Sequence, residues 1–256
     1  MSFAGAPQGA PDFLFWMRSM MMRKYLIPCL AFALQCLTTH AAVPDPASDA
    51  MPIAAQYREI SPVGDGKPRS SDWYLVRRAG EVDIVRGDYA EVWKRDERGE
   101  IDLTRVFHDD RKLVAYSGGE LRTQRRYPEG SALNTLFDPR HVATLKPDGK
   151  LTWLGRSATR YKGTLAGKKA EVVWLDKESL VAKLLRSNAR GRTGVELKAL
   201  HATPDAAWPR TGLDGTDDYA LIDGADFGDM EYDPFVQRVT ARDGMHGGAG
   251  GHAHSH

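Results

Sequence analysis

The sequence predicts a mainly β protein of the α+β class, built as a strongly curved antiparallel sheet, an open half-barrel, with one or two short helices on its concave face. Two observations predict this fold. Short segments rich in aromatic and β-branched residues recur at close spacing over residues 73–116 and again over 160–201. Between these two groups the apolar spacing changes from that of a strand to that of a helix.

Length and charge restrict the class of protein. The chain has 256 residues, of which 42% are hydrophobic and 27% charged, a composition typical of one or two globular domains. Its 35 Lys and Arg residues against 34 Asp and Glu residues give a formal net charge of +1. Because binding to a phosphate backbone needs an excess of cations, we expect no general nucleic-acid binding.

The beginning of the chain resembles an export signal. Met22-Arg23-Lys24 is followed by an uncharged, mostly apolar run from Tyr25 to Leu37 and then by small residues as far as Ala42. The apolar run is too short for a transmembrane helix, which needs about 20 apolar residues. We therefore expect residues 1–42 to be a signal peptide, with translation starting at one of several methionines near residue 20. The mature protein is expected in the periplasm, at most peripheral to a membrane.

The two cysteines, Cys29 and Cys36, both lie inside this signal. The mature chain would therefore have no disulfide and no thiol for catalysis or metal binding. Motifs of hydrolases, zinc proteases and dinucleotide-binding enzymes are also absent from the sequence after residue 42. We expect the protein not to be an enzyme.

The mature chain is predicted to contain one folded domain. Residues 43–70 are rich in Pro, Ala, Ser, Asp and Gly, which indicates a flexible linker. Residues 71–240 are expected to form the single half-barrel domain. The strands of its first meander are predicted from alternating apolar and polar residues, at residues 73–76, 82–85, 89–95, 101–107 and 112–116.

A helix is expected after the first meander. Pro128-Glu129 precedes apolar residues at positions 132, 133, 136 and 137, and Asp138-Pro139 would end the helix. Residues 141–145 are expected to add a further helical turn. The second meander follows, with strands predicted at residues 160–165, 170–175, 180–186 and 195–201.

The second meander also resembles a known family. Tyr161-Lys162-Gly163, the run from Val173 to Leu180, Arg186 and Glu196-Leu197 are similar to the half-barrel of periplasmic lipoprotein carriers (LolA/LolB-like) and of the RseB-like regulatory domain. The similarity spans roughly residues 72–200. It implies an open half-barrel whose apolar concavity holds acyl chains or a partner peptide.

Aromatic residues on or beside the predicted strands are candidates for the wall of such a cavity. Wide, rigid rings can keep a cavity wall apolar and open, although packing in an ordinary core is the simpler explanation of the same residues. The candidates are Trp73, Trp93, Phe107, Tyr161 and Trp174.

The C-terminal tail, residues 241–256, is expected to be disordered and is rich in glycine and histidine. Neutral imidazoles on a flexible chain can bind Zn²⁺, Cu²⁺ or Ni²⁺, with poor selectivity because nothing fixes their geometry. The tail could buffer metal, deliver it to a partner or have no function. The candidate ligands are His246, His252, His254 and His256.

An acidic segment, residues 213–235, precedes the tail. It contains eight acidic residues between Asp214 and Asp233 and no Lys or Arg in that interval. The spacing does not match a Ca²⁺ loop, so we expect docking on the sheet by apolar residues, with carboxylates facing water or nearby arginines. The expected docking residues are Phe227, Met230, Tyr232 and Phe235. The expected counter-charges are Arg105, Arg111, Arg122, Arg125 and Arg126.

These observations favour a periplasmic, non-enzymatic binding protein that holds a hydrophobic ligand, such as an acyl chain or lipoprotein, or an envelope partner in an aromatic-lined concavity. The alternative is an accessory protein that binds a transition metal through its histidine tail.

Overall fold

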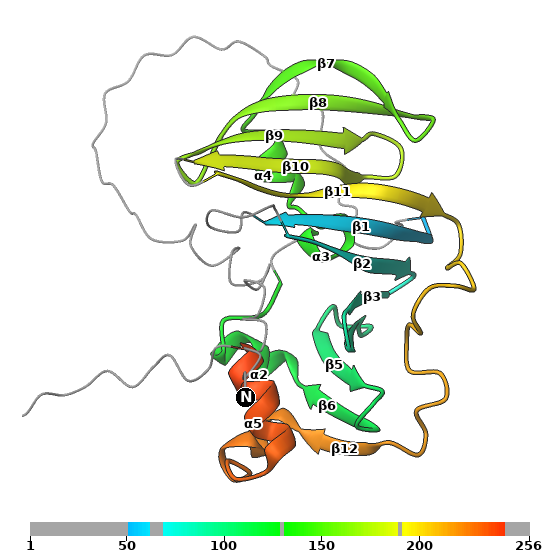
Figure 1. The fold of residues 1–256 in the computed structure, drawn as a ribbon, viewed down its shortest axis with the longest axis vertical. Helices are drawn as coiled ribbons and strands as arrows, with labels where there is room; N and C mark the ends of the chain where they lie inside the picture. Colours follow the sequence, from blue (N-terminus) through cyan, green and yellow to red (C-terminus); the bar gives the residue numbers. More distant parts are fainter. Residues whose placement is uncertain (1–50, 62–68, 129–130, 189–190, 244–256) are drawn as a thin grey trace, which may run out of the picture.

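The computed structural model describes residues 51–61, 69–128, 131–188 and 191–243. Strands dominate this part of the chain and form one 12-stranded sheet, in the order β12-β6-β5-β4-β3-β2-β1-β11-β10-β9-β8-β7 (Figure 1). Every neighbouring pair is antiparallel except β12 and β6, which are parallel. The mainly β, mostly antiparallel fold is thereby confirmed, while the half-barrel curvature stays a prediction.

The elements follow one another closely along the chain. The strands are β1 (Ile53–Ser61), β2 (Arg69–Arg78), β3 (Glu81–Arg86), β4 (Tyr89–Arg95), β5 (Ile101–Phe107), β6 (Lys112–Tyr116), β7 (Lys146–Trp153), β8 (Arg156–Leu165), β9 (Lys168–Leu175), β10 (Leu180–Asn188), β11 (Gly191–His201) and β12 (Ala220–Asp223). The helices are α2 (Gly118–Thr123), α3 (Ala132–Thr135), α4 (Pro139–Val142), the 3₁₀ helix η1 (Gly224–Gly228) and α5 (Pro234–Asp243).

The expectation of a flexible linker over residues 43–70 is wrong for residues 53–61, because they form β1, which lies in the middle of the sheet. This strand pairs with β2 on one side and with β11 on the other, and so joins the two meanders. Its side chains at Ala54, Ala55 and Tyr57 are fully buried. The Tyr57 hydroxyl donates a hydrogen bond of 2.7 Å to the carbonyl of Val181. The sequence pattern did not predict this strand, because two alanines and a glutamine within it have low β-propensity.

The two faces of the sheet carry different cores. Directly paired residues share a face, so Leu75, Ile84, Glu91, Arg105 and Val114 form one row across β2 to β6. We call the side with this row the helix face, because α5 packs against it through contacts to Arg105 and Phe107. The opposite side is the outer face.

The helix face carries the larger core. Its buried members come from both meanders and from the helices, including Tyr57, Trp73, Leu103, Val172 and Phe235. One buried cation links three segments of this core. Arg77 donates hydrogen bonds to the backbone carbonyls of Met51, Asn134 and Glu178, at 3.1, 2.7 and 2.8 Å. Burial lowers the pKa of Arg77, but these three carbonyls satisfy its planar group of donors.

Several helices and strands differ from expectation. The helix predicted after Pro128 is short in the described part, where α3 covers Ala132–Thr135. Asp138-Pro139 begins a helix rather than ending one, because the Asp138 carboxylate accepts from the Arg140 amide and Pro139 is the first residue of α4. Strands β7 and β12 and helix α2 lay in segments for which no such element was expected.

Helix α5 corrects the expected start of the tail. It runs through Asp243, so residues 241–243 belong to a helix and not to the tail. The Asp233 carboxylate accepts hydrogen bonds from the amides of Phe235 and Val236, at 2.7 and 3.3 Å, and so caps the first turn. Burial of Phe235, Val236 and Val239 then fixes one side of the helix on the sheet.

The outer face has a smaller core under a long connection. We call residues 202–219, which join β11 to β12, the strap; it descends along one side of the sheet in Figure 1. Leu213 and Tyr219 of the strap pack against Val85, Val92 and Val106. The Trp208 ring contacts the Tyr74 ring, with centroids 5.0 Å apart.

A buried carboxylate lies beneath the strap. Asp83 is fully buried and accepts a hydrogen bond of 2.5 Å from Arg78, which also donates to Thr211 of the strap at 3.3 Å. The Oδ1 atom of Asp83 has no hydrogen-bond partner among the described residues. Burial raises the pKa of Asp83 to about 6, and Arg78 offsets this only in part.

We predict that Asp83 weakens the fold as the pH rises. Because its pKa is higher in the folded than in the unfolded chain, the folded state binds the proton more tightly, and stability is lost as the pH passes through 6. The free energy of unfolding of Asp83→Asn should therefore gain about 2 kcal/mol relative to wild type between pH 4.5 and 7.5. Urea unfolding at several pH values measures this change.

Asp72→Asn is the matched control. Asp72 binds Arg58 at 2.7 Å, which lowers the pKa of Asp72, so both folded and unfolded forms are already ionised over most of this pH range. Its difference from wild type should stay nearly constant between pH 4.5 and 7.5. The same flat profile for Asp83→Asn would contradict the prediction.

Candidate functional site

The five aromatic residues predicted to line a cavity all lie on the helix face, on five strands. Trp73, Trp93 and Phe107 belong to the first meander, and their exposed fractions are only 2, 1 and 3%. Tyr161 and Trp174, on β8 and β9, are half-buried and pack against the same core. The structure brings the first three into a closed core, while the second two keep part of their surface open to solvent.

The buried rings are held by specific contacts. The ring of Trp73 stacks on Tyr57, with centroids 4.6 Å apart. The indole nitrogen of Trp93 donates to the Glu91 carboxylate at 3.3 Å. Phe107 stacks on Tyr89 at 5.8 Å. These contacts give the three rings a role in packing, and any ligand would have to displace something to reach them.

Helix α5 is the element that covers Phe107. Its Phe235 ring meets the Phe107 ring edge to face, with centroids 5.0 Å apart. The Arg242 guanidinium lies over Tyr89, 4.9 Å from the ring centroid. The surface beneath α5 is thus aromatic across β4 and β5 and is closed by the apolar side of one short helix.

A buried ionic cluster joins the end of α5 to the sheet. Arg105 on β5 donates to both carboxylate oxygens of Asp243, at 2.7 and 2.5 Å, and to Glu91 at 3.2 Å. The side chains of Arg105, Glu91 and Asp243 are 2, 6 and 5% exposed. Arg126 adds a second cation, 3.9 Å from Asp243. These charge-assisted hydrogen bonds hold the last turn of α5 over the middle of β5.

The electrostatics of the cluster favour the charged form of Arg105. Burial alone lowers the pKa of Arg105, but the carboxylates of Glu91 and Asp243 more than offset that effect, and its pKa lies above the ordinary value. Burial also raises the pKa of the neighbouring Tyr116 hydroxyl, which stays neutral. The cluster contains two carboxyl groups and two guanidinium groups, so its formal charges cancel under the helix.

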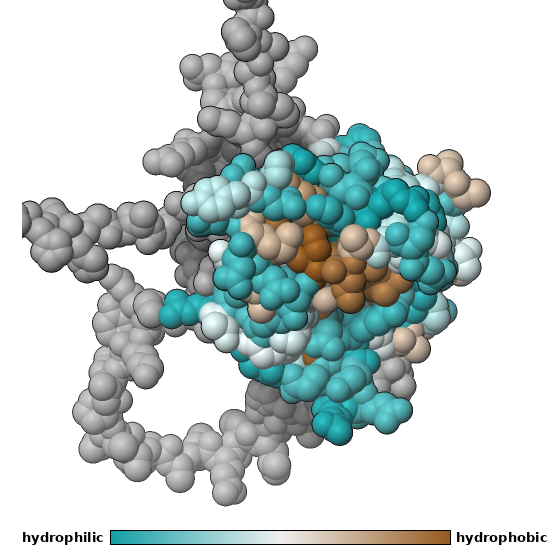
Figure 2. All heavy atoms as spheres, turned by 90° about the horizontal axis from the view of Figure 1, so that it is seen from below, coloured by the Kyte–Doolittle hydropathy of each residue, from teal (hydrophilic) through white to brown (hydrophobic). Residues whose placement is uncertain are grey.

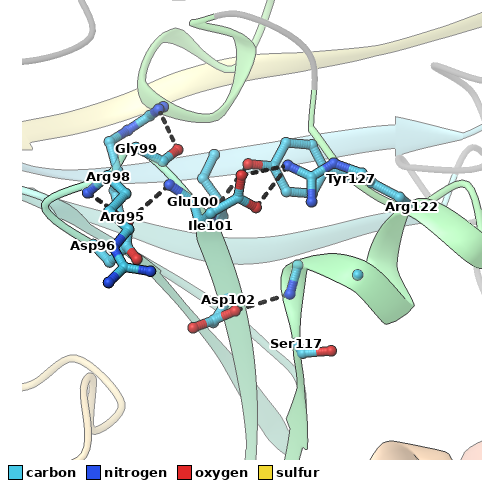
Figure 3. A network of polar contacts seen from close by, with 12 residues as sticks. Arg95, Asp96, Arg98, Gly99, Glu100, Ile101, Asp102, Ser117, Arg122 and Tyr127 are labelled. Carbon is cyan, nitrogen blue, oxygen red and sulfur yellow. Dashed lines mark hydrogen bonds and ion pairs between the residues drawn. The ribbon is translucent and has the colours of Figure 1, made fainter.

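Helix α2, in contrast, is fastened to the β4–β5 hairpin by contacts near in sequence (Figure 3). The amide of Gly118 donates to Asp102 at 2.8 Å, and Arg122 binds the Glu100 carboxylate at 2.6 Å. A capping box between Ser117 and Glu120 closes its first turn. Of these two helices, α2 is tied to its own hairpin, whereas α5 is tied to strands more than a hundred residues away.

The acidic segment docks partly as expected. Phe235 is buried, and Phe227 and Met230 pack against the core. Tyr232 is 83% exposed, so its expected docking contact is wrong.

The expected counter-charges have different partners. Arg111 pairs with Asp218 of the acidic segment, as predicted. Arg122 instead binds Glu100, and both Arg105 and Arg126 contact Asp243. Sequence reasoning missed Asp243 because it had been assigned to the tail. The signal that could have found it is Asp233-Pro234 followed by apolar residues at positions 235, 236 and 239.

The histidines predicted to bind metal, His246, His252, His254 and His256, lie outside the described residues, so metal binding by the tail stays a prediction. Within the described ranges no group of three or more His, Cys, Asp or Glu side chains could hold a metal ion. No helix among these residues is long and apolar enough to span a membrane.

Comparison with known proteins shows similarity to solved structures only at low identity. No protein-family profile and no curated protein matches the chain. A structure of PNGF-II matches with a TM-score of 0.39 and 14% identity, over 72% of this chain and 34% of that one. The complex of MucA and MucB from Pseudomonas aeruginosa matches with a TM-score of 0.34 and 18% identity, over 60% and 53%. The chain thus spans about a third to a half of the proteins that it resembles.

We predict that Asp243 holds α5 on the sheet. Replacing it with Asn leaves the buried Arg105 with Glu91 as its remaining close carboxylate, and breaking a buried ion pair typically costs about 3–5 kcal/mol. Amide hydrogen exchange in residues 234–243 should therefore accelerate strongly, while exchange in β8 to β10 changes little.

Asp88→Asn provides the control, because Asp88 binds Arg242 of the same helix at 2.6 Å but is 57% exposed. Exposed pairs contribute about 0–1 kcal/mol, so this variant should exchange almost as wild type does. Equal acceleration in both variants, or in neither, would show that the buried cluster does not hold the helix.

Proposed function

We propose that this chain is a non-enzymatic binding protein of the periplasm, and that the helix face beneath α5 takes a hydrophobic ligand of the acyl-chain class when α5 moves aside. The observation that carries the proposal is the aromatic surface of Tyr89 and Phe107, which is closed by Phe235 of one terminal helix. A cover of this kind keeps apolar surface out of water until a ligand replaces it.

The size of α5 supports the proposal. Its 10 residues are fewer than an isolated helix needs to be stable in water, so its structure depends on the sheet beneath it. An acyl chain that entered under the helix would exchange one set of apolar contacts for another, and little burial of the sheet would be lost. The buried ionic cluster at Asp243 then sets how much free energy the exchange requires.

A contact in the second meander supports the half-barrel shape that the proposal includes. The indole nitrogen of Trp153 on β7 donates to the carbonyl of Leu197 on β11, at 3.2 Å. Three strands separate β7 from β11 in the sheet, and neighbouring strands lie about 4.8 Å apart. A side chain reaches across that interval only where the sheet bends strongly, as it does in a half-barrel.

The proposal is tested with untagged protein purified from the periplasm. Native mass spectrometry should show a bound acyl-chain compound, and the delipidated protein should bind palmitate. Asp243→Asn should loosen α5 and so open the path of palmitate to the surface beneath it. This variant should therefore bind palmitate at least about threefold faster than wild type in stopped-flow measurements.

Tyr232→Ser is the control for this experiment, since Tyr232 is 83% exposed and does not cover Phe107. It should bind palmitate as wild type does. Absence of palmitate binding in both wild type and Asp243→Asn would overturn the proposal. A co-purified metal that is lost when residues 244–256 are deleted would instead support metal binding by the histidine tail.

A further inference from the structure

The two edges of the sheet are built differently. Strand β7 at one edge contains Pro147, two lysines and an irregularity in its pairing with β8, which are features that keep an edge from pairing with another chain. Strand β12 at the other edge, with the sequence Ala-Leu-Ile-Asp, has none of these features. No described strand pairs with its outer side.

The backbone of β12 presents a regular edge. The amide of Ala220 donates to the carbonyl of Arg111 at 2.9 Å, and the register with β6 continues without a break to Asp223. Because backbone groups alternate in direction along a strand, those of Ala220 and Ile222 face β6 and those of Leu221 and Asp223 point outward. The outward groups are placed as they would be for one further strand.

The segment after β12 holds this edge in place. A Cβ added at Gly224 would lie 2.4 Å from the Tyr116 ring, so only glycine allows the chain to press so closely against β6. The Phe227 ring then meets Tyr116 edge to face, with centroids 6.4 Å apart. A strand fixed in this way loses little conformational entropy when another strand is added.

An apolar row on the outer face stops at β12. Val85, Ala90, Val106, Leu113 and Leu221 are directly paired from strand to strand. The first three are buried, whereas Leu221 is 68% exposed. Viewed from the β12 end, the surface shows an apolar patch ringed by hydrophilic residues (Figure 2). An apolar residue on an added strand would continue the row and cover Leu221.

The charge around β12 determines which partner fits. Five exposed carboxylates near this strand have no cation within ion-pair distance among the described residues. They are Asp217, Asp223, Asp226, Asp229 and Glu231. The sequence from Asp214 to Asp233 contains no Lys or Arg. A second copy of the chain would bring two such acidic edges together, which is unfavourable, whereas a cationic segment would be attracted.

We propose that β12 accepts an extended, basic segment of a partner polypeptide as a thirteenth strand, with apolar residues at alternate positions facing Leu221 and Lys or Arg at the others. Hydrogen bonds to the outward backbone groups of β12 would supply binding, and the acidic rim would select the charge of the partner. This site is separate from the surface beneath α5, and the two proposals succeed or fail independently.

The test uses the full mature chain and a short synthetic peptide that alternates valine and lysine, with a valine and glutamate peptide for comparison. Fluorescence anisotropy should show the lysine peptide binding at least about tenfold more tightly, and hydrogen exchange of residues 221–223 should slow when it binds. Two further lysine peptides are N-methylated on alternate residues. The peptide methylated at the residues whose amides face β12 should lose binding, because those amides can no longer donate hydrogen bonds. The peptide methylated at the other residues should bind as before.

Two variants with the same change of charge locate the site. Leu221→Lys places a cation beside the incoming strand and should weaken binding about tenfold or more. Tyr232→Lys alters an equally exposed position outside the strand and should change binding less than about threefold. Neither residue is buried, so both variants should fold.

The proposal is overturned if both N-methylated peptides bind equally, if the glutamate peptide binds as tightly as the lysine peptide, or if the lysine peptide does not bind at millimolar concentration. Sedimentation that shows a dimer abolished by Leu221→Lys would also overturn it, in favour of a second copy as the occupant. Unchanged exchange at residues 221–223 on binding would place the peptide elsewhere.

Discussion

The insertion of β1 between β2 and β11 is the contact on which the whole sheet depends. Each meander is a set of local hairpins, and β1 is the strand through which the two sets become one sheet. Its two antiparallel ladders are reinforced by side chains that reach further, because Tyr57 binds the carbonyl of Val181 on β10 and stacks on Trp73 of β2. Without β1, β2 and β11 would each have an unpaired edge, and the core on the helix face would lose Ala55 and Tyr57.

Buried charge is arranged in two distinct ways on the helix face. Arg77 is satisfied by three backbone carbonyls and serves to hold segments of the core together. Arg105 pairs with two carboxylates, and one of them belongs to α5, which follows the long strap and β12 in the chain. A buried ion pair adds little net stability compared with apolar packing, but it strongly favours one geometry over others. The ion pair at Asp243 therefore determines where α5 lies on the sheet more than it adds to the free energy of unfolding.

Sequence reasoning succeeded where structure is local. The strands of both meanders follow from alternating residues and turns, and the predicted ranges for β4, β5 and β8 to β11 overlap those observed. It failed for β1, whose alanines give no strand pattern, and for α5, whose apolar positions were included in an acidic segment. Most contacts between distant residues could not be predicted, although Arg111 was expected to face the acidic segment and does pair with its Asp218. Arg105 and Asp243 are 138 residues apart, and nothing in either local sequence indicates the other.

The topology also dictates an order of assembly. During synthesis the hairpins from β2 to β6 can form as soon as they emerge, but β1 must wait for β11, whose residues follow it by more than a hundred positions. Contacts of such long sequence separation are slow to form, because the intervening chain must first lose conformational entropy. The first strand of the described chain is consequently among the last to become fully paired. A nascent chain that stops before β11 would carry an open edge of Ile, Ala and Tyr, a surface that chaperones of newly made proteins recognise.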